Sequence, residues 1–223
     1  MKVIAVIPAY NEEESIKDVV EEFKRTLPGY DYIVVNDCSK DSTKEILETN
    51  GFNYLDLPVN LGLTGAVQTG YKYAYYNDYD AVIQFDGDGQ HLPQYIPELA
   101  KEIENGYDIV IGSRFVEKKK EVSARMLGSR LISTMIKITT GKKVNDPTSG
   151  MRMLNRKMMK DYALNMNRKP EPDTLAFQLK RGAKVKEVQV EMRDRQGGVS
   201  AYSNISSSIK YMFKVLMTII FFN

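Results

Sequence analysis

The amino-acid sequence predicts an α/β protein in which a mainly parallel sheet is flanked by helices. Its first half alternates short apolar runs with amphipathic segments, which is the pattern of βαβ units. The run Asp80-Ala-Val-Ile-Gln-Phe85 is largely apolar, as is typical of a strand buried on both faces of a parallel sheet. A chain of 223 residues with 43% hydrophobic residues can bury one full core.

The first half is expected to contain alternating strands and helices. Apolar runs predict strands at 3–7, 32–36, 53–57, 81–85 and 108–111. Helical periodicity predicts helices between them, at 13–26, 42–49, 64–76 and 93–104. Each helix would carry the chain back across the sheet, so that successive strands run parallel.

The pattern changes after Arg114. A charged loop at 117–121 leads into a predicted helix over 123–140, which Gly141 ends. Turn-forming residues dominate 144–150. The remaining expected elements are a short strand, helices at 155–164 and 173–181, and a strand at 183–191.

Residues 1–203 are expected to form one folded unit with halves at 1–112 and 113–203, followed by a helix over 204–223. Apolar residues recur in this tail at helical spacing: Ile205, Ile209, Met212, Phe213 and Leu216. The helix could pack on the core, lie in a membrane interface, or begin a membrane span. Its apolar character rises toward the chain end, which favours an interfacial membrane anchor. No signal peptide and no full membrane span are expected.

Charge divides the chain into two unlike halves. Residues 1–112 carry 8 Lys and Arg against 20 Asp and Glu, a net charge of −12, and residues 113–223 carry 23 against 9, a net charge of +14. Opposite charges could simply meet between the halves. The alternative, which we favour, is an acidic metal-binding half joined to a half that meets phosphates or an anionic membrane. The single cysteine, Cys38, is typical of a reducing compartment.

Asp86-Gly-Asp88 is the strongest candidate for a chemical site. It follows the predicted strand at 81–85, and open α/β sheets bind ligands beyond the carboxyl ends of their strands. Two carboxylates so close together repel one another unless a cation joins them. A divalent metal that carries a phosphorylated ligand would do so. A surface turn is the alternative for an isolated Asp-Gly-Asp.

Several segments together resemble the family 2 glycosyltransferases, which bind nucleotide sugars on a GT-A fold. The segments occur in the family's order: Val34-Val-Asn-Asp37-Cys-Ser39, Asn60-Leu-Gly-Leu-Thr-Gly-Ala66 with Gly70, Phe85-Asp-Gly-Asp-Gly-Gln-His91-Leu-Pro93, Gly112-Ser-Arg-Phe115, Asp146-Pro-Thr-Ser-Gly150 and Arg193-Asp-Arg-Gln-Gly-Gly-Val-Ser200. The last three resemble the branch that includes dolichol-phosphate mannose synthase and bacterial polyprenyl-phosphate glycosyltransferases. No Gly-rich phosphate loop follows the first strand, which argues against a dinucleotide-binding dehydrogenase.

The resemblance implies a nucleotide-sugar site at the ends of the first strands. Its expected members are Pro8, Ala9, Tyr10, Glu12, Asp37, Asn60, Gly62, Asp86, Gly87, Arg195 and Ser200. Asp37 would accept a hydrogen bond from the base, although it could instead cap a helix. Arg195 and Ser200, with Arg193, resemble a lid over the diphosphate. Ala201 stands where relatives often have lysine, so a lysine contact there is in doubt.

The resemblance also implies a Mg²⁺ or Mn²⁺ ion. Asp88 would be its ligand, and Gln90 a second one, because oxygen ligands suit these ions. Asp86 would lie near the sugar and the diphosphate. The only histidine, His91, could serve the metal or diphosphate, or could be structural. It has no Cys or His companions for a zinc site.

On the acceptor side, Arg114 and Arg130 resemble arginines that bind an acceptor phosphate. The planar guanidinium suits phosphate oxygens, although surface roles are the alternative for both residues. Asp146 would orient these arginines or the acceptor. Glu171 and Asp173 lie where many family members place a catalytic base, and they could equally stabilise a helix N-terminus.

The sequence therefore leads to the hypothesis of an inverting, metal-dependent glycosyltransferase. It would transfer a sugar, most readily from a UDP-sugar, to a polyprenyl phosphate at the cytoplasmic membrane face, for cell-surface glycan synthesis. A small membrane protein or a second copy of the chain could assist lipid access, and no nucleic-acid partner is expected. The alternative is a transferase that extends a saccharide and uses Glu171 or Asp173 as base.

Overall fold

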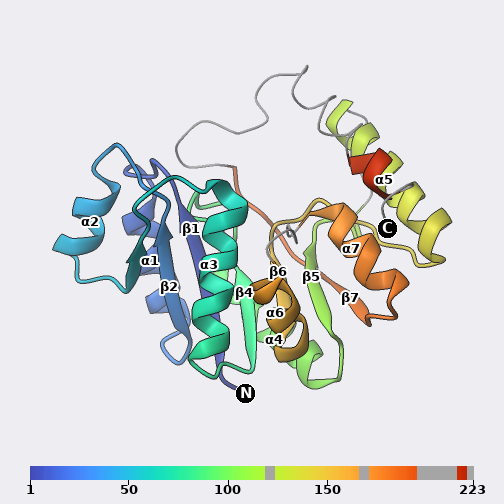
Figure 1. The fold of residues 1–223 in the computed structure, drawn as a ribbon, viewed down its shortest axis with the longest axis horizontal. Helices are drawn as coiled ribbons and strands as arrows, with labels where there is room; N and C mark the ends of the chain where they lie inside the picture. Colours follow the sequence, from blue (N-terminus) through green and yellow to red (C-terminus); the bar gives the residue numbers. More distant parts are fainter. Residues whose placement is uncertain (119–123, 166–170, 195–214, 220–223) are drawn as a thin grey trace.

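A seven-stranded sheet forms the centre of the protein in the computed structural model, which describes residues 1–118, 124–165, 171–194 and 215–219. The strands lie in the order β3-β2-β1-β4-β6-β5-β7 (Figure 1). Their bounds are Val3–Ala9 for β1, Asp31–Asn36 for β2, Tyr54–Asp56 for β3, Ala81–Gln84 for β4, Ile109–Ser113 for β5, Arg152–Asn155 for β6 and Val185–Gln189 for β7. Strand β6 is antiparallel to both neighbours, and all other pairs are parallel.

Helices cover both faces of the sheet. One face packs against α1 (Ile16–Thr26), α2 (Thr43–Thr49) and α4 (Ile96–Glu104), the last of which follows a 3₁₀ turn at Pro93–Tyr95. The other face packs against α3 (Gly62–Tyr76), α5 (Ala124–Thr140), α6 (Arg156–Leu164) and α7 (Pro172–Lys180). The predicted α/β sandwich is thus confirmed, and its helices and strands begin and end within a few residues of the expected positions.

Strand β1 forms the middle of the core because both of its faces are apolar. Val3, Ala5 and Ile7 pack on the α1 side, while Ile4 and Val6 pack on the α3 side, following the two-residue period of a strand. Helix α3 approaches the sheet closely at Gly70. A Cβ at that position would lie 2.2 Å from Cγ1 of Val6, so only glycine fits there.

The strand order reverses between β1 and β4, and this places the candidate site. The chain leaves β1 toward β2 and β3 on one side, whereas β4 lies on the other side of β1. The carboxyl ends of β1, β2 and β4 therefore share one edge of the sheet. This is the position at which open α/β sheets form a ligand crevice.

The described part of the C-terminal tail is helical and packs on the core. Val215 and Ile219 are buried against the α3 side of the sheet, and Nζ of Lys180 donates to the carbonyl of Ile219 at 3.5 Å. The rest of the predicted 204–223 helix lies outside the described residues. Among the residues that are described, no helix is long and apolar enough to cross a membrane.

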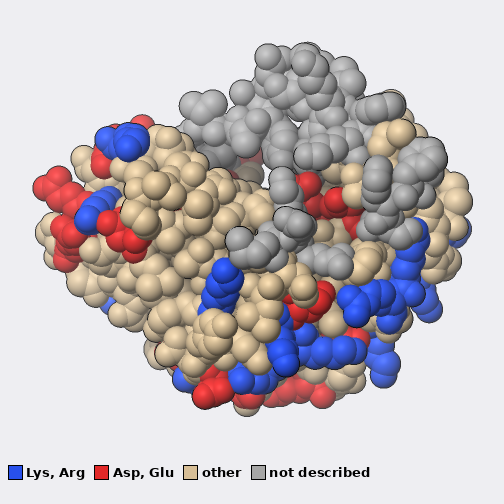
Figure 2. Space-filling model, in the orientation of Figure 1, with Lys and Arg blue, Asp and Glu red and all other residues tan. Residues whose placement is uncertain are grey.

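The two ends of the molecule differ in surface charge, as the sequence predicts. Figure 2 shows acidic side chains, with a few basic ones among them, around α2, and mainly basic side chains on the side that carries α6 and α7.

Candidate active site

The loops after β1 and β2 are tied together by short polar side chains. The N–H of Glu12 donates to Oγ1 of Thr43 at 2.9 Å, and that hydroxyl donates to Oδ1 of Asp41 at 2.6 Å. Oδ2 of Asp41 accepts the N–H of Glu13 at 3.1 Å. Asp41 thus stabilises both the start of α2 and the loop that carries Glu12, which places the predicted nucleotide residues on one rigid edge.

Asp37 joins this edge to the start of α3. Its carboxylate is buried, and Oδ1 accepts the N–H of Leu61 at 2.6 Å. Burial raises the pKa of Asp37, and the backbone amides of Leu61 and Gly62 partly offset that rise. Asn60 lies alongside, and its Nδ2 donates to the Asp37 carbonyl at 3.2 Å. The structure therefore brings Asp37, Asn60 and Gly62 together, and Asp37 meets the N-terminus of α3 and not that of α2.

The Asp86-Gly-Asp88 loop is held against the end of β1. The hydroxyl of Ser15 donates to the carbonyl of Gly87 at 2.8 Å, and its oxygen lies 3.2 Å from Oε2 of Glu12. A Cβ on Gly87 would lie 3.0 Å from the carbonyl oxygen of Pro8, so a larger residue would push the loop away from β1. Ala9, the last residue of β1, links this strand to the end of β2, because its carbonyl accepts the N–H of Asp37 at 2.9 Å. Tyr10 follows and is exposed.

Two buried side chains hold Asp86. Nε2 of Gln84 donates to Oδ1 of Asp86 at 2.8 Å. Nδ1 of His91 accepts the N–H of Asp86 at 3.0 Å, so this nitrogen carries no proton. His91 is buried and packs edge-on against Phe85 at 5.7 Å between ring centroids. His91 thus supports the backbone of Asp86, and Gln84 is a supporting residue that the sequence analysis missed.

The carboxylates of the loop fit a hard divalent cation. Asp88 is largely buried, and its Oδ1 accepts the N–H of Gln90 at 3.1 Å, which fixes its orientation. Among the described residues no group of three or more His, Cys, Asp or Glu side chains could hold a metal by itself. A Mg²⁺ ion commonly takes one or two carboxylates and completes its shell with phosphates and water. Asp88 and Gln90 therefore suit an ion that arrives with a diphosphate.

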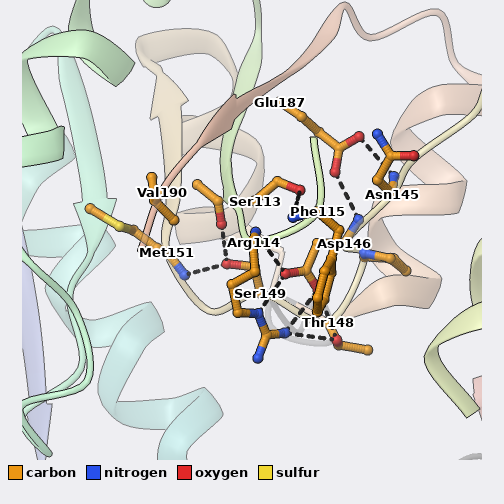
Figure 3. Close-up of polar contacts among 12 residues, drawn as sticks. Ser113, Arg114, Phe115, Asn145, Asp146, Thr148, Ser149, Met151, Glu187 and Val190 are labelled. Carbon is orange, nitrogen blue, oxygen red and sulfur yellow. Dashed lines mark hydrogen bonds and ion pairs between the residues drawn. The ribbon is translucent and has the colours of Figure 1, made fainter. Parts of the chain in front are cut away.

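Arg114 and Asp146 form an ion pair at the end of β5, in which the Arg114 side chain is partly exposed. Nε and one terminal nitrogen of Arg114 donate to the two carboxylate oxygens of Asp146 at 2.7 and 2.9 Å, and the backbone N–H of Arg114 donates to Oδ2 at 3.2 Å (Figure 3). Asp146 is fully buried. Burial by itself raises the pKa of Asp146, but the hydrogen bonds and charge of Arg114 outweigh it and hold the pKa below its usual range.

The turn 146–150 connects this pair to the Asp-Gly-Asp loop. At its far end, a Cβ on Gly150 would lie 2.9 Å from Oδ2 of Asp86. Arg152 supports the turn from below: its side chain is buried, with Nε donating to the Ser149 carbonyl at 2.9 Å and a terminal nitrogen donating to the Pro147 carbonyl. The predicted donor and acceptor motifs are therefore in contact. Arg152 was missed by the sequence analysis, because an arginine inside a short strand gives no signal of its own.

Arg130 lies on α5 and lines a cavity of about 630 Å³ beside the Arg114 loop. The cavity also takes residues from the loop after β5 and from the segment before Asp146. Its basic lining residues are Lys118, Arg130, Lys137 and Lys143, against one acid, Glu117, and Lys118 pairs with Glu191 at 2.7 Å. This distribution suits an anionic group next to Arg114.

Glu171 and Asp173 lie at the N-terminus of α7. Glu171 is the N-cap residue, and Oδ1 of Asp173 accepts the N–H of Thr174 at 2.9 Å. The carbonyl of Glu171 accepts from a terminal nitrogen of Arg152 at 3.2 Å, which ties this helix end to the turn 146–150. Both acids are thus in the positions of helix-stabilising residues, and the backbone of Glu171 is linked through Arg152 to the turn 146–150.

The predicted lid lies mostly outside the described residues, including Arg195 and Ser200. Arg193 is described, and its two terminal nitrogens donate to the carboxylate of Glu22 on α1 at 2.8 Å each. Its N–H donates to the carbonyl of Gln90 at 3.0 Å. The start of this segment is therefore anchored beside the candidate metal ligand.

Comparison with known proteins gives a consistent result. The chain is 34% identical over 180 residues to a dolichol-phosphate mannosyltransferase of Pyrococcus furiosus, an alignment that covers 74% of this chain and 49% of the relative. It is 32% identical over 160 residues to an undecaprenyl-phosphate mannosyltransferase of Micrococcus luteus, covering 68% of this chain and 65% of the relative. The chain thus spans about half of the first relative and just under two thirds of the second.

The fold is shared with solved structures. Glucosyl-3-phosphoglycerate synthase of Mycobacterium tuberculosis, solved in complex with Mn²⁺, uridine diphosphate and phosphoglyceric acid, superposes with a TM-score of 0.70 at 19% identity, over 97% of this chain and 76% of the other. The model of the family described as "Glycosyl transferase family 2" matches residues 4–163. The chain described here belongs to glycosyl transferase family 2.

Proposed function

We propose that this protein transfers a sugar from a nucleotide sugar to a polyprenyl phosphate, with inversion at the anomeric carbon. The observation that carries the proposal is the contact between the two motifs: the turn 146–150 holds Arg114 at one end and touches Asp86 at the other. A donor sugar beside Asp86 and an acceptor phosphate beside Arg114 would then be neighbours. The two mannosyltransferase relatives are named for polyprenyl-phosphate acceptors, which supports this choice of acceptor.

The donor would occupy the edge formed by β1, β2 and β4. Tyr10 would stack on the base and Asp37 would accept from it, while Glu12 would accept from the ribose hydroxyls. Pro8, Ala9, Asn60, Gly62 and Gly87 would line the rest of the nucleotide pocket, and Arg195 and Ser200 would close over the diphosphate. UDP is our first candidate for the nucleotide.

A Mg²⁺ or Mn²⁺ ion held by Asp88 and Gln90 would neutralise charge on the leaving nucleoside diphosphate. Asp86 would orient the sugar, supported by Gln84 and His91. An acceptor phosphate oxygen would attack the anomeric carbon, a new carbon–oxygen bond would form, and the bond to the diphosphate would break. A phosphate is already ionised near neutral pH, so this step needs no protein base.

The acceptor phosphate would be bound by Arg114 and Arg130. Two nitrogens of the Arg114 guanidinium bind Asp146, and the second terminal nitrogen makes no hydrogen bond to another described residue. It is therefore available for a phosphate oxygen. The basic cavity beside it, with Arg130 in its wall, would hold additional negative charge.

The surface of α5 supports a membrane-associated acceptor. Leu127, Leu131 and Ile138 are exposed along one side of this helix, and Arg130 and Lys137 flank them. Exposed apolar residues bordered by cations are typical of a helix that lies on an anionic membrane surface. We propose peripheral attachment at the cytoplasmic face, with a small membrane protein or a second copy as a further partner, and a role in cell-surface glycan synthesis.

The experiment is a transfer assay with purified protein, undecaprenyl phosphate, Mg²⁺ or Mn²⁺ and labelled nucleotide sugars. We expect acid-labile label in the organic phase, lost in Asp88→Asn and Arg114→Ala. Asp78→Asn is the matched control, since Asp78 is an exposed acid that precedes β4, at the opposite end of that strand from Asp86. If the protein hydrolyses a donor but labels no lipid phosphate, the proposed acceptor is wrong.

A second candidate is a transferase that extends a saccharide, with Glu171 or Asp173 as base. It is favoured by one observation, the link from the Glu171 carbonyl through Arg152 to the acceptor turn. A hydroxyl acceptor needs a base, whereas a phosphate does not. Asp173→Asn should then remove nearly all activity, while under the main proposal it should lower the rate only mildly.

A further inference from the structure

We propose that Glu187 and Gln189 on β7 are positioning residues that together hold the Arg114 guanidinium in the orientation in which it binds the acceptor phosphate. The inference rests on the proposed function of Arg114. Both residues lie outside the segments that carry the family motifs, and neither touches the guanidinium itself. Each holds the backbone of one member of the Arg114–Asp146 pair.

Gln189 holds the loop that carries Arg114. Its Oε1 accepts the N–H groups of Val116 and Glu117, each at 2.9 Å. Its Nε2 donates to the carbonyl of Arg114 at 3.2 Å and to that of Val190 at 3.0 Å. One side-chain amide thus uses two acceptor and two donor positions to fix the path of the chain directly after Arg114.

Glu187 holds the turn that carries Asp146. Its two carboxylate oxygens accept the N–H groups of Asn145 and Asp146, each at 2.7 Å (Figure 3). A carboxylate that accepts two adjacent amides restrains both the position and the tilt of the turn. Because Glu187 holds the backbone of Asp146, the carboxylate of Asp146 is kept in position to face Arg114.

The register of the sheet explains how one strand reaches both loops. Strand β7 runs parallel to β5, with Glu187 beside Ile111 and Gln189 beside Ser113, the last residue of β5. Residues two apart on a strand share one face. Val188 between them points into the core on the opposite face. Strand β7 therefore fixes the distance between the Arg114 loop and the Asp146 turn.

The test compares three variants of these residues with a control on the same strand. Gln189→Leu removes both donors and acceptors at similar volume, Gln189→Glu keeps the acceptors alone, and Glu187→Gln replaces one acceptor by a donor. Lys186→Gln is the matched control, because Lys186 is exposed and lies on the opposite face of β7. Two quantities are measured: the hydrogen-exchange rate of the Arg114 Nε–H by NMR, assigned from its loss in Arg114→Lys, and the steady-state KM and kcat for the lipid phosphate.

We expect the Arg114 Nε–H to exchange about ten-fold faster in Gln189→Leu and Glu187→Gln, because each leaves backbone groups without a partner and loosens the pair. The KM for the acceptor should rise about ten-fold while the KM for the donor stays constant, with Gln189→Glu intermediate. Lys186→Gln should match the wild type in both measurements.

An exchange rate that is unchanged in all three β7 variants would overturn the inference, whether or not the variants lose stability. Equal effects on the KM of donor and acceptor would also overturn it, since a general loss of structure acts on both. The two proposals fail separately. A wild-type protein that labels no lipid phosphate contradicts the proposed function. The exchange rates of the Arg114 Nε–H still decide whether β7 holds the Arg114 side chain in position.

Discussion

The donor edge and the acceptor edge of this protein are built in different ways. At the donor edge, the loops after β1, β2 and β4 are joined by short polar side chains such as Ser15, Asp41 and Thr43, which bind backbone groups of neighbouring loops. At the acceptor edge, an ion pair between partly exposed Arg114 and fully buried Asp146 lies at the centre, and side chains from β6 and β7 hold it. The first edge is therefore a surface preformed by hydrogen bonds between loops, whereas the second depends on an ion pair that compensates the fully buried charge of Asp146.

This difference predicts different consequences of substitution. A change at the donor edge should remove a ligand contact and leave the fold nearly intact. A change at the acceptor edge should affect stability and function together, because a buried charge that loses its partner is costly.

The largest effect is expected for Asp88→Asn. Loss of the metal ligand should lower the transfer rate about 1,000-fold, corresponding to roughly 4 kcal/mol of transition-state stabilisation, with little change in the free energy of unfolding. Transfer rates and urea unfolding of the same samples measure both quantities, and Asp78→Asn is the control. A large loss of stability in Asp88→Asn would show that the donor edge is not a preformed surface.

Arg114→Ala should destabilise the protein by about 3–5 kcal/mol, because it leaves Asp146 buried and unpaired. The transfer rate should fall as well. The double variant Arg114→Ala/Asp146→Ala should recover part of the lost stability and none of the activity. Urea unfolding of the single and double variants gives the coupling free energy between the two side chains. A coupling near zero would contradict the central role of the pair.

The same pair predicts a pH dependence of stability. The pKa of Asp146 is lowered in the folded state, so its contribution is fully present above the unfolded pKa of about 3.9 and is lost as the pH falls through the lower folded pKa. Between pH 7 and pH 3 the wild type should therefore lose more stability than Asp146→Asn. Urea unfolding at both pH values tests this, and parallel losses in the two proteins would contradict it.

Much of this architecture could be predicted from the sequence, and the residues that were missed have a common cause. The strands and the Asp86-Gly-Asp88 loop follow from local apolar runs and turn residues, whereas the link between Asp146 and Arg114 was one of two roles that the family resemblance implied for Asp146. Arg152, Glu187 and Gln189 act on loops far from them in the chain. Their partners depend on the position of β6 between β4 and β5 and on the register of β7 beside β5, and no local pattern encodes that placement.

Gly150→Ala tests the junction between the two edges. The added Cβ would lie 2.9 Å from Oδ2 of Asp86 and 3.5 Å from Cε1 of His91, so the carboxylate must shift. We expect the transfer rate to fall about ten-fold, since small displacements near reacting groups are costly, while stability changes by about 1 kcal/mol. Gly141→Ala is not an equivalent control because of its positive φ, whereas Gly29→Ala is, since its Cβ would meet no atom within 4 Å. An unchanged rate in Gly150→Ala would show that the contact between the turn 146–150 and Asp86 does not contribute to transfer.

The smallest effect is expected at the surface of α5. Lys137→Glu should weaken binding to anionic vesicles about ten-fold, because reversing one charge near a membrane removes roughly 1 kcal/mol of attraction and adds repulsion. Lys17→Glu on α1 is the control for net charge, since Lys17 is exposed on the donor half. Vesicle co-sedimentation measures the vesicle affinity of both variants at low and at high salt. The difference in affinity between the two variants should shrink at high salt. If Lys17→Glu weakens binding equally, the attraction comes from net charge and not from α5, and membrane contact could not be assigned to the acceptor edge.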